Sequence, residues 1–218
     1  MQTTIFGPPG TGKTTTLINI VKQELDNGTK PENIAFVSFS RKAAEEARDR
    51  SAEALNIGAD QMVWFRTLHS FAFQNIGIGS KQVLKGSDYN QLGRLLGLEF
   101  ASNSSLTMAD GNLFSAGKGG DAYLSLIQLA RVRGVSLEQQ FNDANDRRLY
   151  FQQLKIVNQV LLDYKRDTGK IDFVDMIEKF IDEGDCPLLD VLIVDEAQDL
   201  SPMQWKMIHD VMKPRAKR

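Results

Sequence analysis

The chain has 218 residues, of which 42% are hydrophobic and 25% are charged, and its formal net charge is -2. This composition is ordinary for a globular protein of one domain, or of one domain with a large insertion. It excludes a globally basic nucleic-acid coat but not a local basic groove, because steering depends on where the charges lie. The only cysteine, Cys186, excludes a disulfide framework and predicts a reducing, cytoplasmic location. No apolar run is long enough to span a bilayer, so we expect no membrane partner.

The first third of the chain alternates short apolar runs with helical periodicity. We expect strands at residues 3–6, 34–39 and 62–65, and helices at residues 13–26, 41–55 and from 67 to about 74. Near the other end, residues 188–194 form an aliphatic run typical of a strand buried on both faces of a parallel sheet. This order of strands and helices predicts an α/β domain with a parallel sheet and right-handed crossovers.

The middle of the chain differs, because residues 76–168 contain no convincing strand. Helical spacing predicts helices at residues 89–96, 122–132 and 146–165, with loops at residues 77–80 and 115–120. The glycines at 117–120 lack a preceding strand, so a flexible linker explains them better than a second phosphate nest. The simplest organisation is a mostly helical subdomain at residues 76–169, inserted into a sheet domain formed by residues 1–75 and 170–218.

A glycine-rich loop separates the first expected strand from the first expected helix. Residues 7–14 read Gly-Pro-Pro-Gly-Thr-Gly-Lys-Thr and fit the pattern G-x-x-x-x-G-K-[ST]. Glycines let backbone N–H groups face phosphate oxygens, and the helix N-terminus adds partial positive charge. Lys13 is expected to reach the β- and γ-phosphates, and the Thr14 hydroxyl to bind Mg²⁺. The predicted nucleotide-binding residues are Gly7, Pro8, Pro9, Gly10, Thr11, Gly12, Lys13, Thr14 and Thr15.

Two carboxylates follow the apolar run at residues 188–194. Asp195 and Glu196 are thereby delivered to the carboxyl edge of the sheet, where α/β proteins bind ligands. We expect Asp195 to hold Mg²⁺, and Glu196 to orient and deprotonate the attacking water. The alternative is that both are ordinary solvated carboxylates at a strand end, without a functional role. The phosphate loop in the same chain disfavours this alternative. A nucleotide kinase needs no water-activating glutamate, so Glu196 favours a hydrolase.

Together with three segments between them, these motifs resemble the first motor domain of superfamily I helicases of the UvrD/Rep/PcrA group. The five segments, in the family's order, are residues 7–14 (motif I), 36–44 (motif Ia, Phe-Val-Ser-Phe-Ser-Arg-Lys-Ala-Ala), 67–71 (Thr-Leu-His-Ser-Phe), 171–176 (Ile-Asp-Phe-Val-Asp-Met) and 194–199 (motif II, Val-Asp-Glu-Ala-Gln-Asp). The resemblance implies a RecA-like P-loop NTPase domain with a 1B-like helical insertion. It also implies ATP and Mg²⁺ at the phosphate loop, and a DNA helicase or translocase moving 3′ to 5′.

The resemblance assigns roles to single residues. Gln198 would sense the γ-phosphate and join Glu196 and Lys13 as a catalytic residue. The track of single-stranded DNA would be formed by Phe39, Ser40, Lys42, Thr67 and His69. A structural histidine that caps its helix is the alternative for His69.

Other polar and aromatic residues carry weaker expectations. Three basic pairs of the insertion either touch duplex DNA or form solvated helix faces: Arg131/Arg133, Arg147/Arg148 and Lys165/Arg166. Trp64 and Trp205 are expected in the core or at an interface rather than under a base.

The chain departs from the family pattern at both ends. Only six residues precede Gly7, so the family's adenine-reading glutamine is missing and adenine selectivity stays open. Beyond Arg218 the family pattern continues with a Gly-Asp-x-x-Gln motif and a second motor domain, which supplies most of the arginines that meet the γ-phosphate. We therefore expect this chain alone to bind nucleotide weakly, to hydrolyse it very slowly and not to unwind DNA. Two other interpretations stay open: a short nucleotide-dependent DNA-binding module that acts with a partner, and an unrelated P-loop enzyme such as a nucleotide kinase.

Overall fold

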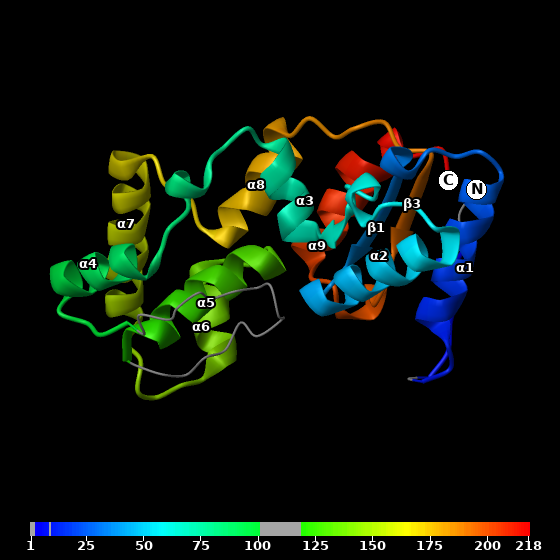
Figure 1. The fold of residues 1–218 in the computed structure, drawn as a ribbon. Coiled ribbons are helices and arrows are strands. Elements are labelled where there is room, and N and C mark those ends of the chain that lie inside the picture. Colours follow the sequence, from blue (N-terminus) through cyan, green and yellow to red (C-terminus); the bar gives the residue numbers. More distant parts are fainter. Residues whose placement is uncertain (1–2, 9, 101–118) are drawn as a thin grey trace.

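The computed structural model describes residues 3–8, 10–100 and 119–218 of the chain. A sheet with its covering helices lies at one end and a group of helices at the other, with α3 (Leu68–Asn75) and α8 (Phe173–Glu183) between them (Figure 1). The C-terminal end of the chain lies at the sheet end (Figure 1). Within the described ranges, no helix has the length and apolar character needed to cross a membrane.

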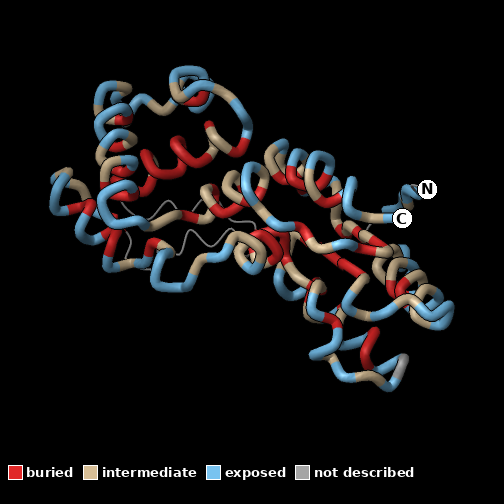
Figure 2. Tube along the Cα trace, turned by 90° about the horizontal axis from the view of Figure 1, so that it is seen from above, coloured by how far each residue is buried: buried red, intermediate tan, exposed pale blue. Residues whose placement is uncertain are grey.

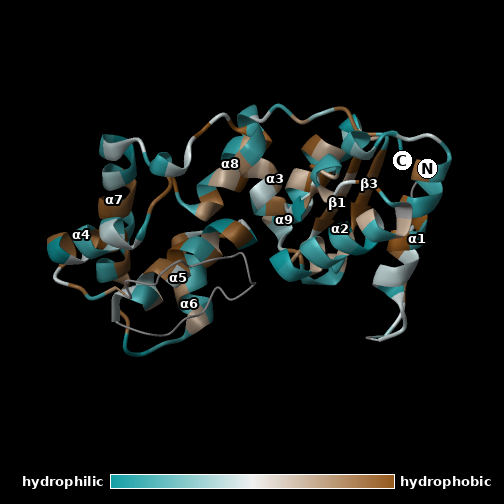
Figure 3. Ribbon diagram, in the orientation of Figure 1, coloured by the Kyte–Doolittle hydropathy of each residue, from teal (hydrophilic) through white to brown (hydrophobic). Residues whose placement is uncertain are grey.

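The sheet is parallel throughout, with three strands in the described residues. They are β1 (Ile34–Ser38), β2 (Phe65–Thr67) and β3 (Val191–Val194), in the order β2-β1-β3. The central strand pairs on both sides, with Phe36 opposite Phe65 and also opposite Ile193. Every residue of β1 is buried, and the strands are among the most hydrophobic parts of the chain (Figure 3). Helices on both faces explain this unbroken apolar run.

Alternate residues of the strands face two separate cores. On one face, Phe36 and Ile193 pack against α1 (Lys13–Asp26) and α2 (Arg41–Leu55). On the other face, Ala35 and Val37 pack against α3, α8 and the C-terminal helices. Those last helices are α9 (Pro202–Lys206), followed by a π-helical segment, Met207–Met212.

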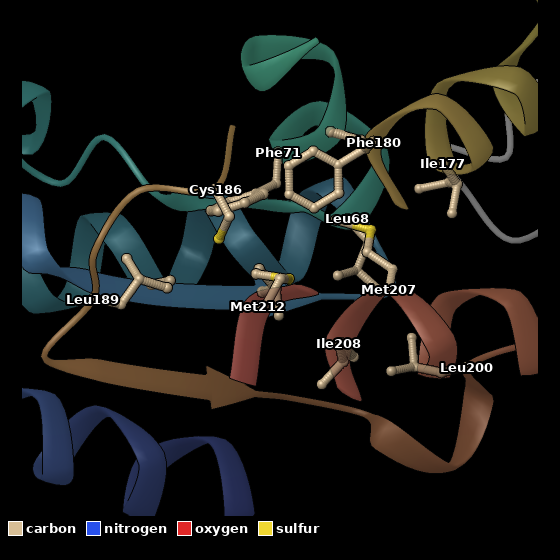
Figure 4. Close-up of a cluster of buried hydrophobic side chains, with 13 residues drawn as sticks. Leu68, Phe71, Ile177, Phe180, Cys186, Leu189, Leu200, Met207, Ile208 and Met212 are labelled. Carbon is tan, nitrogen blue, oxygen red and sulfur yellow. The ribbon is translucent and has the colours of Figure 1, made fainter. Parts of the chain in front are cut away.

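The second of these cores holds α3 and α8 together. Phe71 of α3 and Phe180 of α8 lie side by side, with ring centroids 5.7 Å apart in an edge-to-face arrangement (Figure 4). Met207 and Met212 approach from the C-terminal segment (Figure 4). Trp64 and Trp205 pack against the margin of this core, which confirms their expected position.

The helices at the other end have a hydrophobic core of their own. They are α4 (Gly86–Leu96), α5 (Gly119–Arg133), α6 (Leu137–Ala144) and α7 (Phe151–Thr168). Leu92, Leu124, Ile127, Leu154 and Leu161 meet between them, and none belongs to the two cores of the sheet. Figure 2 shows these helices buried along their inner sides and exposed along their outer sides.

The strand expected at residues 3–6 is wrong. Residues 3–8 have no regular structure, and the Phe6 side chain is 90% exposed. The outer edge of β3 is paired instead with the last residues of the chain, since Leu189 N donates to Arg215 O (2.8 Å) and Leu192 N to Arg218 O (2.8 Å). The apolar run before the phosphate loop therefore has no strand partner in the described residues.

Other elements are present with different bounds. The strand expected at 62–65 is Phe65–Thr67, and the run at 188–194 pairs with β1 only from Val191. The helix expected from residue 146 begins at Phe151, since the Asp146 carboxylate accepts a hydrogen bond from Arg148 N (3.0 Å) and makes a turn.

Helix α6 was not expected, and α5 begins within the expected linker. Gly119 and Gly120 open α5. A Cβ on Gly120 would lie 2.6 Å from the Phe100 ring, so glycine permits this close packing. Residues 115–118 of the expected linker lie outside the described residues.

Candidate functional site

The phosphate loop closes around its own lysine. Gly10 and Gly12 both have φ of +79°, a left-handed conformation that favours glycine, and α1 begins directly after Gly12. Lys13 Nζ donates to the carbonyl oxygens of Gly7 (2.8 Å) and Pro8 (3.0 Å). The Thr11 hydroxyl also donates to Pro8 O (2.7 Å). The ammonium is thus held within the loop; Pro9 lies outside the described residues.

The two predicted metal ligands meet, although they lie 181 residues apart in the sequence. Thr14 Oγ1 donates to Asp195 Oδ2 at 3.2 Å. Burial raises the pKa of Asp195 above its usual value, while the N–H of Glu196 and the Thr14 hydroxyl oppose this rise. A hydroxyl and a carboxylate oxygen are ligands that suit Mg²⁺. The residues present therefore fit a magnesium ion between the phosphate loop and the end of β3.

Glu196 and Gln198 are also brought together. Glu196 adopts a left-handed conformation with φ of +50°, which is uncommon for a residue other than glycine. Gln198 Nε2 donates to the Glu196 carboxylate and, at 3.3 Å, to Asp199 Oδ2. The turn after β3 thus holds the Glu196 side chain beside the amide of Gln198.

The carboxyl edge of the sheet places the predicted DNA track next to the metal ligands. Ser40 caps α2 by accepting from Ala43 N (3.2 Å), and Thr67 caps α3 by accepting from Ser70 N (3.3 Å). Asp195 N donates to Val37 O (2.9 Å), which joins the ends of β3 and β1. Since neighbouring strands lie about 4.8 Å apart, the β2-β1-β3 order puts the ends of β2 and β3 about 10 Å apart.

A groove of 880 Å³ begins beside the end of β2. Six segments line it: α2, the loop before β2, β2 itself, α3, residues 80–86 and the start of α8. It contains Thr67 and His69 of the predicted track, whereas Phe39, Ser40 and Lys42 are not among its lining residues. Of these three, Phe39 and Ser40 are partly buried and Lys42 is exposed. The structure therefore divides the five predicted residues between the groove and the N-terminal end of α2.

His69 is a buried, neutral side chain. It is 6% exposed and meets the Phe173 ring edge-on, with centroids 6.1 Å apart. Burial lowers the pKa of His69 to about 4, although the carboxylate of Asp172 opposes this effect. The alternative in which His69 caps its helix is wrong, because Thr67 makes that cap.

The depressed pKa of His69 predicts that acid destabilises the protein. An unfolded histidine titrates near pH 6.5, so between pH 6.5 and 4 the unfolded chain binds a proton that the folded chain does not. The free energy of unfolding should fall by up to about 3 kcal/mol as the pH falls through this window. Urea denaturation of the wild type and His69→Gln at several pH values measures this loss. An equally steep decline in the variant would contradict the assignment to His69.

Two basic residues of the insertion are neither solvated nor free for duplex DNA, which corrects the sequence interpretation for them. Lys165 Nζ donates to Asp172 Oδ2 (2.9 Å) and Asp175 Oδ2 (2.8 Å). Arg131 ion-pairs with Asp172 (3.2 Å), Asp175 and Glu178. Asp172 is 1% exposed and, with Asp175, also caps the start of α8. The segment that resembles Asp-Phe-x-Asp thus joins α8 to α5 and α7.

The other basic residues of these pairs are more exposed. Arg133 pairs with Asp143 (3.0 Å), Arg148 with Asp146 (2.6 Å) and Arg166 with Asp163 (2.9 Å). These pairs fit the expectation of solvated helix faces.

Several residues near the site were not anticipated from the sequence. Arg50 of α2 donates from Nη2 to Thr15 Oγ1 (3.3 Å), beside the predicted nucleotide-binding residues. The groove is lined by Arg41, Arg48, Arg66 and Lys85 and by two partly exposed rings, Phe73 and Phe173. Arg66 directly precedes the Thr-x-His motif. Its place beside this motif was the one sequence signal that could have indicated Arg66 as a site residue.

The comparisons with known proteins agree with these motifs. The family model of the UvrD/REP helicase N-terminal domain matches residues 1–217. No curated protein matches the chain.

Proposed function

The chain belongs to the UvrD/REP helicase N-terminal domain family, and we propose that it is the ATP-binding motor domain of a 3′-to-5′ DNA helicase or translocase. Helicases of this family hydrolyse ATP with Mg²⁺ and act on DNA. The proposal goes beyond these family properties in two ways: it assigns roles to single residues of this chain, and it gives the direction of movement along DNA.

The observation that carries the proposal is the contact between Thr14 and Asp195. A hydroxyl that follows the phosphate-loop lysine lies 3.2 Å from a carboxylate at the end of β3. Nucleotide hydrolases that use a phosphate loop hold Mg²⁺ between these two groups. When bound, the ion neutralises charge on the phosphates. Thr14 and Asp195 would hold it there.

The remaining roles are proposed from the resemblance of these segments to the family's motifs. Lys13 would leave its two loop carbonyls to bind the β- and γ-phosphates. Glu196 would orient the attacking water and accept its proton. Gln198, hydrogen-bonded to Glu196, would pass the state of the γ-phosphate to the neighbouring strand ends.

The DNA half of the proposal places a single strand along the carboxyl edge of the sheet. Ser40 and Lys42 lie at the start of α2, and Thr67 and His69 lie in the groove beside β2. Residues 76–169 would act as a helical subdomain over this path. Arginines that meet the γ-phosphate would come from a second motor domain, so we propose that hydrolysis by these 218 residues alone is very slow.

Removal of either metal ligand tests the proposal. Thr14→Ala and Asp195→Asn should each weaken the Mg²⁺-dependent binding of a slowly hydrolysed ATP analogue by about tenfold, because one ligand of the ion is lost. Isothermal titration calorimetry with and without Mg²⁺ measures this effect.

Thr16→Ala provides the matched control. Its hydroxyl donates to Gly12 O (3.1 Å) on the same helix and has no contact with Asp195. We expect affinity within about twofold of the wild type. Wild-type affinity and Mg²⁺ dependence in both ligand variants would exclude a metal-dependent nucleotide site here.

A further inference from the structure

Two cations of the groove have no carboxylate partner in the described ranges. Arg66 donates from Nε to Val63 O and from Nη1 to Ser70 Oγ (3.2 Å), so its contacts are neutral. The Lys85 side chain is exposed, and none of the ion pairs of the described residues involves it. Unpaired cations that line one groove indicate a site for anions.

The charged lining of the groove is positive on balance, with four cations (Arg41, Arg48, Arg66 and Lys85) and two carboxylates (Glu45 and Asp60). Glu45 pairs with Arg41 at 2.8 Å, and none of the ion pairs of the described residues joins Asp60 to Arg66 or Lys85. Burial and, after it, the nearby Arg48 lower the pKa of Arg66, although Arg48 itself pairs with Asp49 at 2.8 Å. An anion beside Arg66 would supply the opposite charge that its two neutral contacts do not.

The aromatic lining favours a single polynucleotide strand. The residues that line the groove come from α2, β2, α3 and residues 80–86, among other segments. Phe73 and Phe173 are partly exposed along it. A single strand presents phosphates to cations and base faces to aromatic rings, whereas the bases of a duplex are stacked on one another.

We propose that Arg66 and Lys85 bind phosphates of a single-stranded polynucleotide that lies in this groove and passes from the sheet to the segment entering the helical group. This inference rests on the proposed function and extends the contact with nucleic acid beyond Thr67 and His69. Arg66 would hold a phosphate beside the end of β2, and Lys85 another at the start of α4.

The test measures the affinity of the 218-residue chain for a fluorescent oligothymidylate as a function of salt. For a single strand, each neutralised phosphate contributes a slope of about -0.7 to the logarithm of affinity against that of salt. Arg66→Gln and Lys85→Ala should each lower the affinity about fivefold at about 0.1 M salt and reduce the slope by about 0.7. In the double variant, the two reductions in slope should add and the two losses of affinity should multiply.

Controls separate this effect from general charge and from folding. Lys81→Ala and Arg94→Ala each remove one exposed cation near the groove segment and α4 but outside the groove lining, and should leave the slope unchanged. Arg66→Lys should restore the slope, because the positive charge returns. Affinity for the ATP analogue should be the same in all variants.

The outcomes distinguish the two proposals. If the wild type binds the oligonucleotide and both groove variants keep its affinity and slope, the groove inference is overturned and the proposed function stands. If the wild type binds no single strand with or without nucleotide, both fail. Equal, Arg66-dependent binding of a blunt duplex would also overturn the choice of a single strand.

Discussion

Lys13→Ala is expected to weaken the binding of Mg²⁺–ATP by about 100-fold or more. The Lys13 ammonium already lies inside the phosphate loop, bonded to the carbonyl oxygens of Gly7 and Pro8. Charge-assisted hydrogen bonds to phosphate contribute about 1.5–3 kcal/mol each, and about 2.7 kcal/mol corresponds to 100-fold in affinity. Calorimetric titration with a slowly hydrolysed analogue measures the loss.

Lys22→Ala is the matched control, since Lys22 is an exposed lysine on the same helix. It should bind nucleotide as the wild type does. The thermal stability of Lys13→Ala should change little, because its side chain contacts only two carbonyl groups of an exposed loop. An affinity within threefold of the wild type would mean that the loop does not bind phosphate through Lys13.

Asp172→Asn is expected to lower the free energy of unfolding at pH 7 by about 1.5–3 kcal/mol. The change keeps the shape of the side chain but removes the most buried of the carboxylates that pair with Lys165 and Arg131. Asp175 still pairs with both cations, so the loss is that of charge-assisted hydrogen bonds rather than of all compensation. Urea denaturation measures it.

The same carboxylate gives the protein a second sensitivity to acid. Burial opposes ionisation of Asp172, but Lys165 and Arg131 hold its pKa below the usual value. A depressed pKa means that the stabilisation is present above about pH 4 and disappears as the pH falls through the folded-state value. Asp172→Asn should therefore be less sensitive than the wild type to pH below about 4.

Asp163→Asn serves as the control, because Asp163 pairs with Arg166 on the exposed side of α7. Its effect should stay below about 0.5 kcal/mol. A similarly small effect of Asp172→Asn would show that the buried pairs do not determine how α8 is attached to α5 and α7.

Local sequence patterns were sufficient to predict the elements that carry a clear motif or hydrophobic periodicity of their own. The phosphate loop with α1, the buried strand Ile34–Ser38 and helix α3 all lie close to their expected places. Pairing at a distance was not predictable in this way. Ile5 and Phe6 look like a strand, but the available edge of β3 is paired with residues 215–218.

The site was predicted in the same uneven manner. Local signals, a phosphate loop and an acidic strand end, pointed to Thr14 and Asp195, and the structure brings these two residues within 3.2 Å of each other. The burial of Lys165 was not visible, since its place on α7 resembles a solvated face until Asp172 is brought against it. Arg66 and Lys85 meet in one groove only through tertiary structure.

The order of the strands also constrains how the chain folds. β1 and β3 are neighbours in the sheet although they lie far apart in the sequence. The hydrogen bond from Asn33 Nδ2 to Asp190 Oδ2 (3.0 Å), for example, joins residues 157 positions apart. The helical group lies between them and closes its own core with nearer contacts. Because loop closure opposes distant pairing, the helices should form first during synthesis. The contact between Thr14 and Asp195 should form only after β3 has emerged from the ribosome.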